Sequence, residues 1–212
     1  MTVPSLMQNY QRQSYVTQLH KVYNEFSQAF LQYQTEKNAL NLAESGFTIG
    51  QDMMPFMKQY FKVIQDCDNT PYPCFAQTYR NMNGGDYTFS TRHTNCGTIA
   101  SGASFCIILD GLDTGTVMTD DFYIQICVDV NGQKGPNIYG RDLFIMYVFP
   151  DGVIDEYRIN PECRTNGNCA GDSPEDARNS LYAGCSGAAG GNSNYSEGCF
   201  GKILNDSWQM KY

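Results

Sequence analysis

The stretch CVDVNGQKGPNIYGRDLFIMYVFPDGVI, residues 127–154, decides the fold. It contains the end of one apolar, β-prone run, which stops at Val130, and the whole of a second run, which begins at Leu143. Polar and turn-forming residues fill the connection between them, and FPDGV is a tight-turn signal that leads into a further β-prone run. Apolar runs joined by short turn-forming segments predict neighbouring antiparallel strands.

Several runs of this kind lie close together in the chain. They span residues 104–109, 121–130, 143–149 and 153–159. Because each run has the length of a strand and is bounded by turn residues, we expect an antiparallel sheet of about four strands within residues 104–159.

The connection between the two central strands carries a cluster of oxygen-bearing side chains: Asp129, Asn131, Asn137 and Asp142. Calcium binds carboxylate, amide and carbonyl oxygens, so these residues are candidate calcium ligands. The spacing departs from an EF-hand, because Gly140 stands where the twelfth place, counted from Asp129, would be glutamate. The alternative is a structural loop, in which the Asn and Asp side chains cap backbone groups and the glycines and Pro136 shape the turns.

Residues 5–44 are expected to form one long helix, with Pro4 suited to its start and Gly46 to its stop. Apolar residues recur within it in steps of three and four and therefore share one face: Val16, Leu19, Tyr23, Phe26, Phe30, Tyr33 and Leu40. At 1.5 Å per residue, a helix of about 40 residues spans roughly 60 Å. Since this exceeds the width of a domain of this size, part of the helix should protrude or lie against a neighbour.

Two further segments suggest helices. Residues 49–65 carry Met and aromatic residues at helical spacing and predict a second helix. The tail, residues 160–212, is loop-rich, with a short helix expected between Pro174 and Gly184 and a final strand that contains Trp208.

These elements divide the chain into two parts. Residues 1–46 hold the long amphipathic helix, and residues 47–212 form a globular head with the second helix, the sheet and the tail. The apolar face of an antiparallel sheet needs a cover, and the long helix is the obvious one. The predicted fold class is therefore α+β, with a long N-terminal amphipathic helix packed on an antiparallel sheet.

The chain is acidic. Its 22 acidic and 14 basic residues give a formal net charge of -8, and no run of Lys or Arg is visible. Such a chain repels phosphate backbones, so nucleic acid is not an expected partner. Its 212 residues suit one domain with a long extension.

The sequence contains nine cysteines, most of them among Gly, Asn, Pro and Ser. Loop cysteines at this density are typical of disulfides formed in an oxidising compartment, and the zinc alternative lacks close-spaced CxxC pairs. Connectivity cannot be deduced from sequence alone, but short loops favour certain pairs: Cys67 with Cys74, Cys163 with Cys169, and Cys185 with Cys199. Cys96 with Cys106 is a fourth candidate pair. Cys127, inside an apolar run, would be the spare buried thiol.

Catalytic motifs are not visible, and we do not expect an enzyme. The chain has no Walker loop, HExxH, GxSxG or GxGxxG after a strand. His93 lies near Cys96, but a Cys–His nucleophile pair also needs an orienting third group, and Cys96 is a disulfide candidate. The adjacent acids Asp155 and Glu156 are interpreted as solvated turn and strand residues.

Three stretches together resemble type IV pilins and type II secretion pseudopilins. The start, VPSLMQNYQRQSYVTQLHKVYNEFSQAF, is similar to the second half of that family's N-terminal helix, whose preceding half is very apolar and ends near a Pro such as Pro4. The middle, DVNGQKGPNIYGRDLFIMYVFPDGVI, carries the DxNG…GPN…GxDxF pattern of pilin-like proteins. The end, CFGKILNDSWQMKY, has their Cys, apolar turn, Trp and terminal Tyr.

The resemblance implies a structural subunit of a type IV pilus or a type II secretion pseudopilus, with a disulfide-tied C-terminal region. Its partners would be other pilin subunits. Assembly would run through the apolar half of the helix, which does not precede Val3 in this sequence and would anchor the natural chain in the inner membrane of a bacterium. The head would be periplasmic before the subunit enters an extracellular or periplasmic filament. No cofactor is required, although calcium in the connection stays open.

The alternative is a binding module, a minor pilin or adhesin-like protein. It would use residues 66–103 and 160–198, which the resemblance does not cover, to hold a surface ligand of unknown identity. The length of these loop-rich segments favours this interpretation, because the main structural subunit of a filament would be expected to have a short head with few long loops. An uptake pilin that binds DNA is disfavoured by the net charge.

Overall fold

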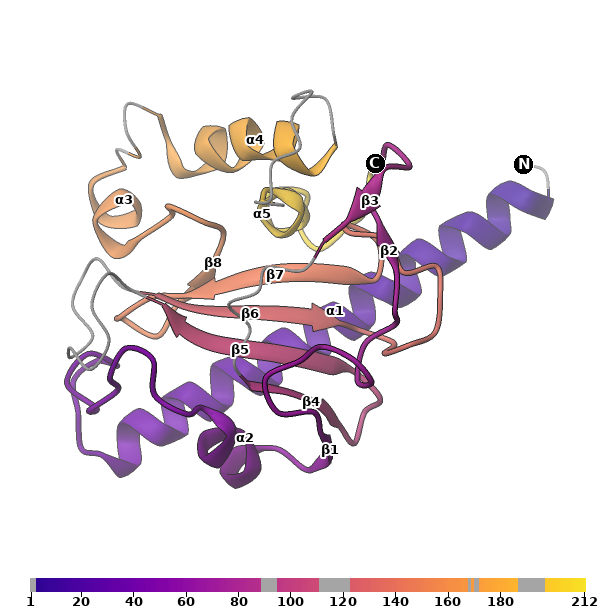
Figure 1. The fold of residues 1–212 in the computed structure, drawn as a ribbon. Coiled ribbons are helices and arrows are strands. Elements are labelled where there is room, and N and C mark those ends of the chain that lie inside the picture. Colours follow the sequence, from indigo (N-terminus) through magenta and orange to yellow (C-terminus); the bar gives the residue numbers. More distant parts are fainter. Residues whose placement is uncertain (1–2, 89–94, 111–122, 168, 170–171, 187–196) are drawn as a thin grey trace.

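Helix α1 (Val3–Glu36) runs behind a central antiparallel sheet in the computed structural model (Figure 1). The structure describes residues 3–88, 95–110, 123–167, 169, 172–186 and 197–212. A small hairpin lies in front of the sheet, and short helices lie along its upper side in the view of Figure 1. The arrangement belongs to the α+β class that the sequence predicts.

The main sheet has six strands in the order β1-β4-β5-β6-β7-β8, and all neighbouring pairs are antiparallel. The strands are β1 (Val63–Asp66), β4 (Asn95–Ile99), β5 (Ser104–Asp110), β6 (Tyr123–Asp129), β7 (Leu143–Val148) and β8 (Ile154–Asp155). A separate hairpin pairs β2 (Tyr79–Arg80) with β3 (Asp86–Tyr87).

The expectation of about four strands is therefore too low. The two additional strands, β1 and β4, have the sequences VIQD and NCGTI, which are too short and too mixed in polarity to show a strand pattern. The strand predicted over residues 153–159 is reduced to β8, and the first two residues of the run 121–130 lie outside the described residues. The hairpin predicted at FPDGV is present, since Gly152 N donates to Phe149 O at 2.9 Å and β7 pairs with β8.

Helix α1 ends earlier than the predicted residue 44. Asn38 adopts a left-handed conformation with φ 51°, which turns the chain out of the helix, and Ala39 N donates to Gln34 O across this turn. Leu40, the last member of the predicted stripe, is consequently 85% exposed, and Leu42 is buried in its place. Among the described residues, no helix is long and apolar enough to span a bilayer.

The second helix is also shorter than the predicted range 49–65. Helix α2 spans Met54–Tyr60, because Pro55 fits its first turn and Phe61 already has extended backbone angles. Val63 and its neighbours then pair as edge strand β1 with β4. The β-branched residues of this segment share the spacing of the preceding helix, so periodicity alone does not separate the two elements.

The tail contains three helices: α3 (Pro161–Asn166), α4 (Pro174–Cys185) and α5 (Cys199–Asn205). The helix predicted between Pro174 and Gly184 is α4, which ends one residue beyond Gly184. Ser173 caps it and accepts a hydrogen bond from Asp176 N at 3.2 Å. The final strand expected around Trp208 is wrong. Trp208 instead has a left-handed φ of 59°, and its ring stacks on His20 of α1 with centroids 4.0 Å apart.

One face of the sheet, here called the helix face, lies against α1. Side chains alternate along each strand, so the register assigns these apolar residues to it: Phe105, Ile107, Leu109, Ile124, Ile126, Val128, Phe144, Met146 and Val148. All are buried, as are Leu19, Phe26 and Phe30 of α1. Aromatic contacts extend the layer toward α2, since the ring centroids of Phe26 and Phe61 lie 4.7 Å apart.

The opposite face, here called the loop face, has a different composition. The register assigns to it Cys96, Ser104, Cys106, Cys127, Asp129, Leu143, Ile145, Tyr147 and Asp155. Residues 74–79 lie on this face, because Ser104 Oγ donates to Cys74 O at 2.6 Å and Tyr79 Oη donates to Asp129 Oδ2 at 2.5 Å. The loop face therefore combines sulfur, hydroxyl and carboxylate groups with apolar residues.

Four disulfides form: the three that short loops favour, Cys67–Cys74, Cys163–Cys169 and Cys185–Cys199, and the fourth candidate pair, Cys96–Cys106. Cys127 is free and buried, as predicted. Cys96, Cys106 and Cys127 stand directly opposite one another on β4, β5 and β6, so the disulfide and the thiol form one row across the loop face.

Candidate functional site

The connection between β6 and β7 is organised by its two carboxylates. Asp142 accepts backbone hydrogen bonds from Asn137 N at 2.8 Å and from Ile138 N at 2.7 Å. Asp129 accepts one from Asn131 N at 3.0 Å, in addition to the bond from Tyr79. Each carboxylate thus fixes the turn beside it, which is the Asx-type capping that short polar side chains provide in loops.

The four candidate calcium ligands divide into two pairs of this kind. Asp129 and Asp142 are fully buried, and their oxygens already accept hydrogen bonds. Within the described residues, no three or more His, Cys, Asp or Glu side chains gather closely enough to hold a metal ion. The Oδ1 atoms of Asn131 and Asn137 are buried and have no hydrogen-bond partner in this structure. The carboxylates therefore have a structural role, and the two amide oxygens are free acceptors.

Burial also changes the acidity of this cluster. It raises the pKa of Asp129 to about 8, against the lowering effect of the Tyr79 hydroxyl, and the nearby Asp142 carboxylate raises it further. The pKa of Asp142 is raised by burial as well, and the pKa of the Cys127 thiol is raised by burial and by Asp129. A thiol of this kind is a poor nucleophile.

The interpretation of Asp155 and Glu156 as solvated residues is wrong, since both are buried. Arg178 of α4 binds Asp155 with two hydrogen bonds, from Nε at 2.8 Å and from Nη2 at 2.5 Å. Glu156 accepts from Gly201 N in the first turn of α5 at 2.8 Å. These adjacent acids attach both C-terminal helices to β8, and burial raises the pKa of Glu156 to about 7.

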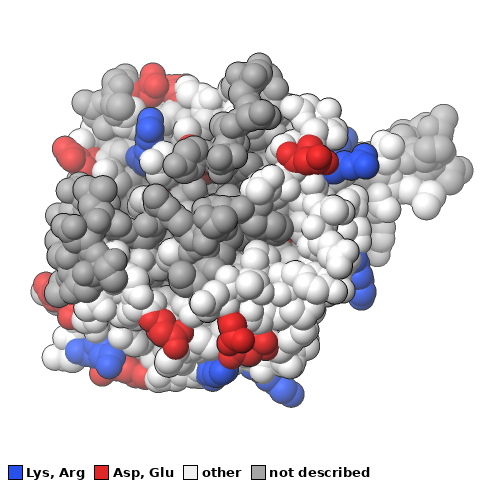
Figure 2. Space-filling model, in the orientation of Figure 1, with Lys and Arg blue, Asp and Glu red and all other residues white. Residues whose placement is uncertain are grey.

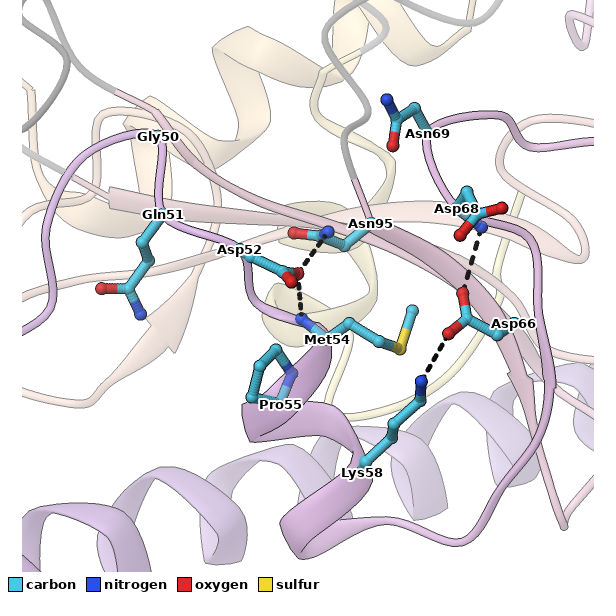
Figure 3. Close-up of a pocket in the computed structure, with 10 residues that line it drawn as sticks. All are labelled: Gly50, Gln51, Asp52, Met54, Pro55, Lys58, Asp66, Asp68, Asn69 and Asn95. Carbon is cyan, nitrogen blue, oxygen red and sulfur yellow. Dashed lines mark hydrogen bonds and ion pairs between the residues drawn. The ribbon is translucent and has the colours of Figure 1, made fainter.

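An open polar pocket lies between α2 and the β1–β4 edge (Figure 3). Its volume is about 590 Å³. Asp52 accepts hydrogen bonds from Met54 N at 2.9 Å and Asn95 Nδ2 at 2.8 Å, and Lys58 reaches across to Asp66 at 2.6 Å. The hydrogen bond from Lys58 holds the pKa of Asp66 below its ordinary value. The charged side chains Lys58 and Asp66 of this pocket are therefore already bound to each other.

A second pocket, here called the sheet-end pocket, lies where the connection meets the β4–β5 turn and residues 73–74. Its volume is about 490 Å³, and it is lined largely by amide and hydroxyl side chains. A third hollow of about 510 Å³ lies over the Cys163–Cys169 disulfide between α3 and α4. These pockets fall within or beside the segments 66–103 and 160–198.

The remaining functional candidates are the Cys96–His93 pair and a basic patch for nucleic acid. Cys96 is bound to Cys106, and His93 lies outside the described residues. On the face seen in Figure 2, the blue Lys and Arg side chains of the described residues lie scattered among the red Asp and Glu side chains and form no broad basic patch. The described residues on this face therefore do not provide the charge pattern that binds a phosphate backbone.

Comparisons of the chain with protein-family models, with curated proteins and with solved structures find no match.

Proposed function

We propose that this chain is a pilin-like structural subunit that assembles into a type IV pilus or a type II secretion pseudopilus through its N-terminal helix. The observation that carries the proposal is the position of α1 relative to the sheet. Its later turns are anchored on the helix face, while its first turns extend past the sheet (Figure 1). Met7 and Tyr10 on this projecting part are 60% and 73% exposed. Large apolar side chains on a projecting helix need a partner surface, and other helices of the same kind supply one.

The three stretches that resemble pilins support the same proposal. The first forms most of α1, the second includes β7 and the connection before it, and the third forms α5 and the tail that contacts α1 through Trp208. In such a subunit α1 transmits assembly contacts to the head. The disulfides hold closed the loops that face neighbours and solvent, each contributing about 2–4 kcal/mol.

The test is filament assembly in the bacterium that encodes the chain, followed with an antibody raised against the head. Sheared surface or envelope filaments should contain the protein. Tyr10→Arg in the full-length gene should abolish the filaments and leave the melting temperature of the soluble domain unchanged. Leu40→Arg, an equally exposed apolar position beyond the other end of α1, is the matched control and should assemble. A monomeric secreted protein, or normal filaments with Tyr10→Arg, would contradict the proposal.

A binding module is the second candidate function, and the pockets on segments 66–103 and 160–198 favour it. A minor pilin or adhesin of this type would use the same fold and would present these segments to a ligand. Deleting the tail loops would disturb the disulfides, so the sharper test is a ligand titration with single substitutions in one pocket.

A further inference from the structure

The sheet-end pocket is built by loops that approach unusually closely. Gly132 has a left-handed φ of 69°, and a Cβ atom there would lie 2.9 Å from the carbonyl oxygen of Gly102 in the β4–β5 turn. Only glycine allows this contact, which brings the connection and the turn together at one end of the sheet. The glycine of the DVNG sequence thus shapes the pocket.

The walls of the pocket are held by a dense set of bonds. Ser104 Oγ donates to Cys74 O, and Thr98 Oγ1 and Ser104 Oγ share a hydrogen bond at 3.2 Å. The Cys67–Cys74 disulfide holds the segment that contains Pro73. Asp129 fixes the backbone of Asn131 in the connection between β6 and β7. A ligand that enters meets preorganised groups, so little ordering opposes its binding.

The lining is polar but nearly uncharged, in a chain of net charge -8. The side chains that give it this character are Gln18, Gln65, Thr98, Asn131, Gln133 and Lys134. Among the described lining residues there is one cation and no carboxylate. Amides and hydroxyls both donate and accept, which suits a ligand whose groups also do both.

Asn131 supplies the most direct indication of a ligand. Its Nδ2 donates to Gly135 O at 3.3 Å, while its Oδ1 is buried and has no partner. A buried acceptor without a donor is unfavourable, so a ligand hydroxyl that reached it would be favoured.

We propose that the sheet-end pocket binds an uncharged saccharide. Sugar hydroxyls donate and accept at once and would pair with the amides of the pocket, including Asn131 Oδ1. One exposed lysine is a weak basis for binding a phosphate or an acidic ligand. The proposal goes beyond filament assembly and does not depend on it, since a subunit of either kind can carry such a pocket.

The experiment is a titration of the chain with three neutral trisaccharides: maltotriose, cellotriose and chitotriose. Saturation-transfer NMR reports contact, and the side-chain amide signals of a ¹⁵N spectrum report the site. We expect at least one trisaccharide to bind and to shift the Asn131 and Gln133 amide signals. Asn131→Ala and Gln133→Ala should each weaken binding by about three- to tenfold, the range for one lost neutral hydrogen bond. Gln209→Ala, an exposed amide far along the chain, is the control and should bind normally.

Gln133 is exposed, so its substitution keeps the test valid even if Asn131→Ala disturbs the turn. The proposal is overturned if no trisaccharide shows saturation transfer at millimolar concentration, or if both alanine variants bind as well as the unmodified chain. Tighter binding of the neutral peptide acetyl-Gly-Ser-Gly-Ser-amide than of every trisaccharide would also overturn it. Filament assembly is tested at Tyr10 and saccharide binding at Asn131, so failure of one leaves the other standing.

Discussion

The helix face and the loop face belong to one sheet and are stabilised by different chemistry. The helix face packs hydrocarbon and aromatic side chains against the continuous helix α1. The loop face instead buries a row of cysteines, the Asp129 carboxylate and the Asp155–Arg178 pair beneath short segments from distant parts of the sequence. An apolar face tolerates any partner of suitable shape, whereas a polar buried face requires each group to meet its own partner.

The largest expected effect lies on the helix face. Phe26→Ala should destabilise the fold by about 3–5 kcal/mol, because it removes a fully buried ring and leaves a cavity. Leu31→Ala on the same helix, at a side chain that is 64% exposed, should change the free energy of unfolding by less than about 0.5 kcal/mol. Urea unfolding of both variants measures the difference. Equal effects would mean that α1 is not anchored through this face.

On the loop face, Arg178→Met should destabilise by about 3 kcal/mol, because it leaves the buried Asp155 without its cation. The double variant Asp155→Asn with Arg178→Met should lose less than the single variant, since no charge is then left unpaired. A double-mutant cycle in urea tests this ordering. If the double variant is the less stable one, the pair is not the source of the effect.

Removing the Cys96–Cys106 disulfide by alanine at both positions should cost about 2–3 kcal/mol, the loop-closure value for ten residues of separation. Cys127→Ala, in the same row but with no covalent bond, should cost about 1 kcal/mol. Thermal unfolding under non-reducing conditions distinguishes the two. A larger loss from Cys127→Ala would show that packing, not the covalent link, dominates this row.

The most gradual effect is a pH dependence from Glu156, because it is spread over several pH units. Its pKa rises from an ordinary value of 4.5 to about 7 in the fold, so the folded state binds the proton more tightly than the unfolded state. Its contribution is fully present below about pH 4.5 and is lost as the pH rises through 7, on the order of 3 kcal/mol. Melting curves at pH 5 and pH 8 should show a larger drop for the unmodified chain than for Glu156→Gln. Asp129, whose pKa is also raised by burial, contributes to both chains alike.

The sequence predicts the helix face well and the loop face poorly. The stripe from Val16 to Tyr33 and the apolar runs of β5, β6 and β7 are periodic or continuous, so local patterns identify them. The disulfide pairs are predictable for the same reason, since each closes a short loop. Strand β1, whose pairing partner is β4, and the burial of Asp155 depend on partners far along the chain, which no local pattern reports.

The candidate site, too, can be predicted from the sequence only in part. Asp129, Asn131, Asn137 and Asp142 stand out in the sequence because oxygen-bearing residues crowd one connection. Their role does not stand out, because it depends on Tyr79, which lies 50 residues before Asp129. The sheet-end pocket needs a turn from one hairpin and a loop from another, so only the fold assembles it.

Helix α1 contains no cysteine, and the four disulfides close loops of 6 to 14 residues within the head. A pulling force applied along α1 would therefore reach the sheet through no disulfide, but through side-chain contacts loaded in shear along the helix and through the backbone that leaves its C-terminal end. The covalent links would keep the head intact while the helix slid. Mechanical strength under tension would thus depend on the apolar stripe of α1, and reducing agents would soften the head without changing the force at which the helix detaches.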